Sequence, residues 1–191
     1  MLTLAEIGPG VYGAWRLAHF DPNGMRYFDR SMTGFWRSFY VAVLVAPLWI
    51  IILAVDFAPM HFAGGWARVA IAETIGYVIN WVAYPLAAYY LTRFIDRPQE
   101  YAGFIVALNW GSLIQLGLQM PAHVIAGTAV VPAGLGEVLV VGTQLVALIY
   151  EWFITRTALR LSGFGAIGFV VLDFLIGSVV NEITALEAYI S

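Results

Sequence analysis

The chain has 191 residues, of which 61% are hydrophobic and only 11% charged, and its formal net charge is −3. A soluble domain of this length has too much surface to be covered by so few charges, so the composition indicates an integral membrane protein whose first partner is the lipid bilayer. Cysteine is absent, which excludes a disulfide framework and a thiolate metal site. No basic patch supports nucleic-acid binding.

Residues 1–34 are too polar to span a bilayer and too aromatic for a free tail. Apolar side chains recur at helical spacing on both sides of an Asp-Pro-Asn-Gly turn at 21–24, namely at Val11, Trp15 and Ala18 and then at Met25, Phe28, Met32 and Phe35. This pattern predicts two short amphipathic helices on the membrane surface, followed by a helical bundle over 35–191.

Five apolar runs are long enough to cross a membrane as helices. We expect spans at about 38–57, 68–92, 100–120, 134–155 and 164–185, with Pro121 ending the third and an apolar loop at 121–133. Small residues four apart, Ala72/Gly76 and Ala107/Gly111, predict that the second and third spans approach each other closely. The predicted fold is an all-α membrane protein, a five-transmembrane-helix bundle with an N-terminal interfacial amphipathic segment.

The arginines predict the orientation of the bundle, because basic residues concentrate on the cytoplasmic side of short-looped membrane proteins. One side has Arg68 alone, and the other side holds Arg16, Arg26, Arg30, Arg37, Arg93, Arg97, Arg156 and Arg160. We therefore expect a multi-pass protein of the bacterial inner (cytoplasmic) membrane, with a cytoplasmic N-terminus and a periplasmic C-terminus.

Four of the five spans carry a polar stripe at helical period, whereas the first span does not. Coherent stripes indicate a shared polar interior, with the first span as its flank. The predicted intramembrane polar site consists of Asp173, Asn80, Asn109, Ser112, Gln115, Gln144 and Asn181.

Asp173 lies near the middle of the last span, where a charged carboxylate costs about 2.5–3.5 kcal/mol on insertion scales. It is either a proton or cation site, or an acid that Asn109, Gln115 or Gln144 satisfies by hydrogen bonding across a helix interface. Glu151 lies close to Arg156 in the sequence, so we expect its side chain to reach the membrane interface. This leaves Asp173 as the only acid that we expect deep within the membrane.

Polar residues nearer the periplasmic side predict an outer vestibule formed by Glu73, Gln119, Glu137 and Glu182. His19, His61 and His123 fall in interfacial or loop positions, and His123 could meet one of these glutamates only through the tertiary fold. No metal-ligand pair at helical spacing, no catalytic motif and no phosphate-binding loop is present. We expect no metal, no cofactor and no enzymatic activity.

An arginine and aromatic residues lead into an apolar run with proline at the start of the first span, FWRSFYVAVLVAPLWIIIL. With this lead-in, the five spans, the amphipathic N-terminal segment and the short loops, the chain resembles the Yip1-type membrane family. The resemblance implies a non-enzymatic protein that associates with partners in the membrane.

Two functions follow as hypotheses. The first is a helper or scaffold subunit that acts through helix–helix association with other membrane proteins. The second is a proton- or cation-linked small-solute transporter or channel subunit, with a polar path centred on Asp173. Five helices are few for a self-sufficient transporter, so transport predicts a homo-oligomer.

Overall fold

The computed structural model describes residues 4–60, 65–128 and 130–189. These residues form helices joined by short turns, without strands. Within them, five helical segments are long and apolar enough to cross a membrane: Met32–Phe57, Gly65–Phe94, Pro98–Gly127, Ala133–Leu159 and Gly163–Leu186. The prediction of an all-helical protein with five candidate spans and a short N-terminal helix is confirmed.

The N-terminal segment consists of the helix α1 (Leu4–Ala18), a 3₁₀ turn η1 (Pro22–Tyr27) and the short helix α2 (Met32–Ser38). The second amphipathic helix predicted from Met25 onward is therefore wrong, because the chain is interrupted between η1 and α2. The interruption has a local cause: the Asp29 carboxylate accepts the Ser31 N–H, and the Ser31 hydroxyl then caps α2 by accepting the Gly34 N–H.

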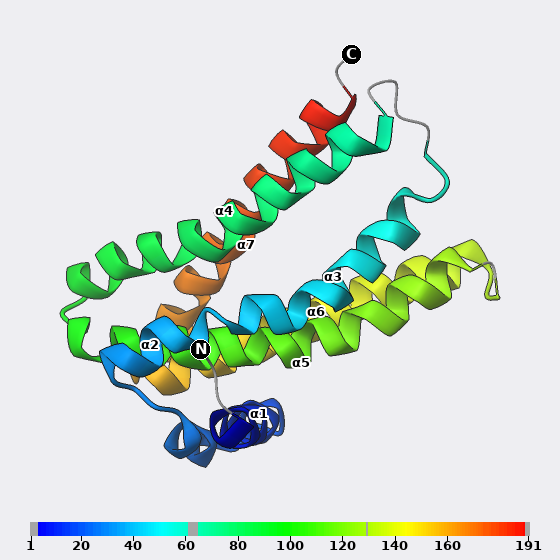
Figure 1. Ribbon diagram of the computed structural model, residues 1–191. Coiled ribbons are helices and arrows are strands. Elements are labelled where there is room, and N and C mark those ends of the chain that lie inside the picture. Colours follow the sequence, from blue (N-terminus) through cyan, green and yellow to red (C-terminus); the bar gives the residue numbers. More distant parts are fainter. Residues whose placement is uncertain (1–3, 61–64, 129, 190–191) are drawn as a thin grey trace.

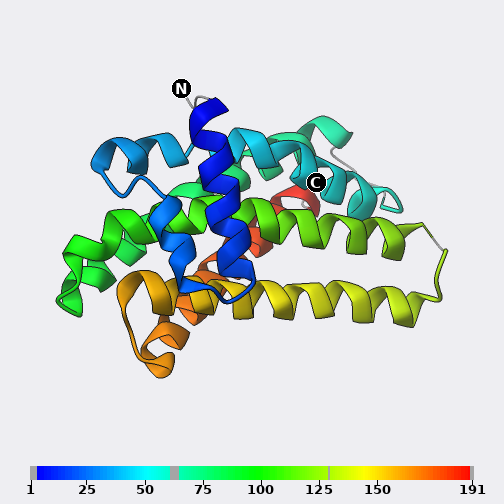
Figure 2. The ribbon, with the colours of Figure 1, turned by 90° about the horizontal axis from the view of Figure 1, so that it is seen from below.

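Helix α1 crosses α5 (Tyr101–Gly127) and α6 (Ala133–Leu159), as Figure 2 shows, and packs against both. Its Ala14 and Leu17 are fully buried. The Tyr150 hydroxyl of α6 donates to the Ala14 carbonyl over 2.8 Å. The N-terminal segment is thus held by the bundle itself and does not rest on lipid alone.

The crossing of α1 over α5 requires a glycine at position 10. A Cβ added there would overlap the buried indole ring of Trp110, whereas a Cβ at Gly8 would meet nothing within 4 Å. Alanine at a helix position is favoured over glycine by about 0.8–1 kcal/mol. We expect Gly8→Ala to raise the midpoint of thermal unfolding and Gly10→Ala to lower it, because overpacking costs about 1–3 kcal/mol. Equal shifts of the two variants would contradict the packing of α1 on Trp110.

An acid-sensitive contact fixes the end of α1. Asp21 accepts the Asn23 N–H over 2.9 Å and the Arg16 Nε–H over 2.7 Å. The Asn23 N–H first, and the Arg16 guanidinium second, hold the pKa of Asp21 below its usual value. Because the folded-state pKa is lowered, the stabilisation is present above the unfolded pKa of about 3.9 and is lost as the pH falls through the folded value.

We therefore expect acidification below about pH 4 to loosen α1 and η1 through Asp21. Hydrogen exchange of the N-terminal segment, compared between the wild type and Asp21→Asn at each pH, measures this. The variant should exchange faster than the wild type at neutral pH and equally fast in acid. A constant difference between the two proteins at every pH would show that the Asp21 carboxylate does not control this segment.

The spanning helices form two pairs. Helix α4 (Gly65–Phe94) packs along α7 (Gly163–Tyr189), and α5 packs along α6, with α3 (Val41–Phe57) on the outer side of α5. Figure 1 shows that the two pairs meet at one end and diverge toward the other. We call α4 with α7 the first wall and α5 with α6 the second wall.

The small residues of the second and third spans serve this pairing and not a contact between those two spans. A Cβ at Gly76 of α4 would lie 2.5 Å from Thr184 of α7, and a Cβ at Gly111 of α5 would lie 2.7 Å from Ile154 of α6. The prediction that Gly76 and Gly111 bring the second and third spans together is wrong, because each glycine packs within its own wall.

Pro121 does not end the third span. Helix α5 continues through it to Gly127, so the predicted loop at 121–133 is much shorter. A proline in a membrane helix is tolerated when neighbouring groups compensate for its missing N–H, which explains the difference.

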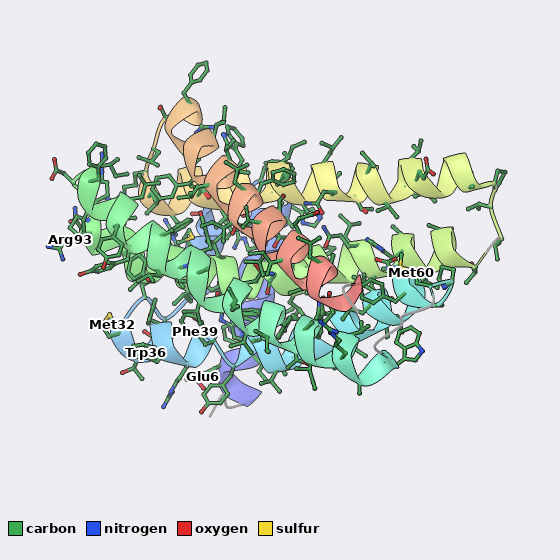
Figure 3. The ribbon with its side chains drawn as sticks, turned by 90° about the horizontal axis from the view of Figure 1, so that it is seen from above. Glu6, Met32, Trp36, Phe39, Met60 and Arg93 are labelled. Carbon is green, nitrogen blue, oxygen red and sulfur yellow. The ribbon has the colours of Figure 1, made fainter. Side chains whose placement is uncertain are left out.

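The end at which the two walls meet carries Arg93 in the last turn of α4, Arg97 just after that helix, and Arg156 and Arg160 at the end of α6. We call it the arginine end. Arg93 lies there, and Met60 lies toward the opposite end (Figure 3). Arg160 pairs with Glu100 over 3.4 Å, and the Tyr101 hydroxyl donates to the Pro85 carbonyl over 2.9 Å. The ion pair ties α6 to the start of α5 within the second wall, and the Tyr101 hydrogen bond joins the second wall to the first.

Candidate functional site

A cavity of about 490 Å³ lies between the two walls. Its polar lining on the first wall consists of Asn80, Tyr84, Asp173, Ser178 and Asn181. Its polar lining on the second wall consists of Asn109, Ser112, Gln115, Gln119, Gln144 and Glu151. No residue of α3 and no basic residue belongs to the lining of this cavity in the described part of the chain.

Two acids, one buried and one half-buried, lie next to each other at the end of the cavity nearest the arginine end. Glu151 of the second wall is only 4% exposed, and its carboxyl group lies within hydrogen-bonding reach of the carboxyl group of Asp173 on the first wall. Two adjacent carboxylates repel each other when both are ionised, so such a pair favours holding one proton between its two members. We call these residues the acidic pair.

Two polar atoms at the closed end of the cavity, one of them in the acidic pair itself, have no hydrogen-bond partner among the described residues. They are the Tyr84 hydroxyl and Glu151 Oε1, and both residues line the cavity. Tyr84 is 5% exposed. A buried polar atom without a partner costs about 1–3 kcal/mol, so these two atoms mark a position where water or a ligand would be stabilised.

Amide side chains hold each wall together further along the cavity. On the first wall the Asn80 amide donates to Asn181 over 3.5 Å, and on the second wall the Gln119 amide donates to Gln144 over 2.7 Å. Gln115 donates to the Ala147 carbonyl over 3.2 Å. These bonds run within a wall, whereas the acidic pair runs between the walls.

Asn109 connects the cavity to the N-terminal segment. Its amide donates to the Ser38 hydroxyl over 2.8 Å, and both residues are buried. A smaller cavity of about 210 Å³ lies on the other side of this bond and is lined in part by Ser38, Glu6 and Arg37. Glu6 and Arg37 form an ion pair there, so α1 is linked to the end of α2.

A layer of packed side chains closes the cavity toward the arginine end. Phe104 and Phe169 are almost fully buried and meet edge to face with ring centroids 5.7 Å apart. The centroid of the Tyr84 ring lies 6.4 Å from that of Phe104. Ala88 and Thr155 are also fully buried. We call Ala88, Phe104, Thr155 and Phe169 the closing layer. Ala88, Thr155 and Phe169 lie about one helical turn nearer the arginine end than the cavity residues Tyr84, Glu151 and Asp173 on the same helices. Phe104 directly precedes Ile105, which lines the edge of the cavity.

The structure brings the predicted intramembrane residues together. Asp173, Asn80, Asn109, Ser112, Gln115, Gln144 and Asn181 all line the one cavity between the walls. The three expected amides have partners other than Asp173 among the described residues: Asn109 bonds to Ser38, Gln115 to Ala147 and Gln144 to Gln119.

The four residues of the predicted outer vestibule do not gather at one place. Gln119 lines the cavity. Glu73 is half-buried against Thr184 of α7, and Glu137 and Glu182 are exposed on the surfaces of α6 and α7. Neither cavity described above is lined by Glu73, Glu137 or Glu182.

Sequence reasoning missed the second acid of the pair. The prediction that Glu151 reaches the membrane interface is wrong, because the neighbouring arginines have other partners: Arg160 pairs with Glu100, and Arg156 lies over the Trp152 ring. The available signal was the seven-residue spacing from Gln144, which places Glu151 on the cavity face of α6.

His123 also differs from expectation. It pairs with Asp56 of α3 over 2.9 Å and not with Glu73, Glu137 or Glu182. His19, just after α1, bonds to the Trp15 carbonyl of that helix, and His61 lies outside the described residues. No group of three or more acids and histidines that could hold a metal ion occurs among the described residues.

The fold and the cavity define a polytopic membrane protein with five candidate spans and a polar interior. Comparisons with protein-family models, with curated proteins and with solved structures found no match. The resemblance to the Yip1-type family therefore stays a prediction.

Proposed function

We propose that this protein is a non-enzymatic carrier, or the membrane subunit of one, that binds a small cation in the cavity and exchanges it for a proton of the acidic pair. The observation that supports this most is the contact between Glu151 and Asp173 at the closed end of a polar cavity. Intramembrane acids are costly, and they characteristically mark ion and proton pathways.

The exchange follows from electrostatics. When no cation is present, one proton shared by the two carboxyl groups removes the repulsion between them. A bound cation supplies the same compensation, so the O–H bond breaks, its electron pair stays on the carboxylate oxygen and the proton leaves to water in the cavity. Cation and proton then compete for one site, which is the basis of coupled exchange.

The closing layer supports access from one side at a time. Phe104 and Phe169 separate the acidic pair from the arginine end, while the walls diverge toward the opposite end (Figure 1). The positive-inside rule assigns the arginine end to the cytoplasm. In this proposal the structure corresponds to a state that faces the periplasm of a bacterial inner membrane, and transport requires a second state in which the closing layer opens.

The helper or scaffold function predicted from the sequence requires that another protein occupy the same cavity. A partner's helix would have to fill it and satisfy Tyr84 and Glu151. Association with other membrane proteins, or with copies of this chain, stays a prediction. The two functions separate in one experiment, because a scaffold moves no protons when a cation is added.

The experiment uses the purified full chain in liposomes that contain a trapped pH-sensitive dye. Sodium, magnesium, tetramethylammonium and benzamidinium chlorides are added outside in turn, with protein-free liposomes as the control. The proposal predicts that at least one cation raises the internal pH only in liposomes that contain the protein. If all four cations give the protein-free response, the carrier function is wrong.

A further inference from the structure

The closed end of the cavity presents acceptors and an aromatic surface together. Besides the acidic pair, the lining includes the Trp81 indole and the Tyr84 and Phe174 rings. Trp81 lies beside Tyr77, with ring centroids 6.1 Å apart, and the Tyr77 hydroxyl bonds to the Ala42 carbonyl of α3 over 2.6 Å. The Trp81 ring therefore lies beside a tyrosine whose own position is fixed by a hydrogen bond to α3.

The size of the cavity points away from a bare metal ion. A volume of about 490 Å³ lies within the usual range of sites for small organic ligands, about 300–1,000 Å³, and far exceeds the roughly 30 Å³ of one water molecule. Metal sites need several converging ligands, and the acids and histidines of the described residues form no group of three.

The unpartnered atoms specify what the ligand must offer. Glu151 Oε1 accepts hydrogen bonds, and the Tyr84 hydroxyl accepts or donates one. Pro85, which also lines the cavity, has no N–H, so the Trp81 carbonyl lacks its usual donor within the helix. A ligand with several N–H donors would satisfy these groups together.

The charge and the rings complete the description. A cation over an aromatic face is attracted by the ring, most strongly by indole. A carboxylate binds an amidinium or ammonium group by charge-assisted hydrogen bonds, with two parallel bonds when the donor is planar. The absence of basic residues from the lining disfavours an anion.

We infer that the cation taken by this cavity is organic: an ammonium or amidinium group with N–H donors, attached to an apolar body. The N–H groups bind the acidic pair and the Tyr84 hydroxyl, and the apolar body lies against Trp81. This inference rests on the proposed carrier function and names its class of substrate.

The test is calorimetric titration of the detergent-purified full chain with benzamidinium and with benzamide, which has nearly the same shape but no charge. Repeating the titration in buffers of different ionisation enthalpy counts the protons released. We expect benzamidinium to bind with proton release, and benzamide to bind at least about ten times more weakly because it cannot replace the proton of the acidic pair.

Variants on α4 assign the contacts. Trp81→Leu should weaken benzamidinium binding by about 2- to 30-fold, and Tyr84→Phe, which keeps the ring, by about 2- to 13-fold. Trp66→Leu and Tyr90→Phe are matched controls, because both residues are exposed on the same helix and outside the cavity. The controls should bind as the wild type does.

The outcomes separate this inference from the proposed function. If sodium or magnesium displaces the proton and benzamidinium does not, the carrier function stands and the organic substrate class is wrong. Equal binding of benzamide and benzamidinium would also overturn the inference. If no cation releases a proton, both proposals fail.

Discussion

Replacing Asp173 with asparagine should abolish cation-driven proton exchange and leave the fold intact. Asp173 is in contact with Glu151 at the closed end of the cavity. Asparagine has nearly the same shape and still hydrogen-bonds to a carboxyl group, so the walls stay joined. Its amide cannot hold the shared proton, and it cannot become a carboxylate when a cation binds. Exchange in liposomes should therefore fall to the protein-free level, with unchanged thermal unfolding.

Each acid of the pair has a matched control on its own helix. Glu182→Gln on α7 and Glu137→Gln on α6 remove exposed acids outside the cavity, and both should exchange at the wild-type rate. Glu151→Gln should fail as Asp173→Asn does. Full exchange by Asp173→Asn would mean that the acidic pair is a structural hydrogen bond and not the site of coupling.

Cysteine labelling should distinguish the two sides of the acidic pair in an all-or-none manner. The chain contains no cysteine, so a single introduced thiol reports one position. Ser112 lines the cavity, whereas Thr155 is fully buried in the closing layer, and its hydroxyl has no partner among the described residues. We expect a membrane-impermeant thiol reagent to label Ser112→Cys nearly completely from one side of the membrane, and Thr155→Cys from neither side.

Two exposed positions identify the sides. Gln99→Cys reports the arginine end, and Glu137→Cys reports the opposite end. Ser112→Cys should react from the same side as Glu137→Cys. Labelling of Thr155→Cys, or of Ser112→Cys from the side of Gln99→Cys, would contradict a cavity that is closed at the arginine end.

The sequence predicts the helices and much of the cavity because the bilayer imposes strong constraints. An apolar run of about 20 residues has few alternatives to a spanning helix. Polar residues at helical period avoid lipid only by facing other helices, which is why Asn109, Ser112 and Gln115 on one span and Asn181 on another line the same cavity.

The features that sequence analysis missed depend on which helices are neighbours. Gly76 packs against α7 and not against α5, and the approach of α6 to α7 brings Glu151 to Asp173. A glutamate near arginines has two low-cost positions, at the interface or inside. Glu151 lies inside because Arg160, which could have paired with it at the interface, pairs with Glu100 instead. Such partners are set by tertiary structure and not by spacing.

The periodicity of apolar residues also could not predict that α1 docks on the bundle. Its apolar face suits a membrane surface and a protein surface equally well. The glycine at position 10, which allows contact with Trp110, is a permissive residue whose neighbour cannot be read from the sequence. The stripe predicted from Val11, Trp15 and Ala18 is not the face that packs most closely: Ala14 and Leu17 are fully buried, whereas Trp15 is exposed.

The most direct test of a hydrated cavity that ends at a proton-holding acidic pair is infrared spectroscopy of the purified protein in H₂O and in D₂O. We predict a carbonyl-stretch band of a protonated carboxyl group that shifts promptly in D₂O and that disappears in the double variant Glu151→Gln/Asp173→Asn. The absence of this band from the wild type, or a band that stays unshifted in D₂O, would contradict the account.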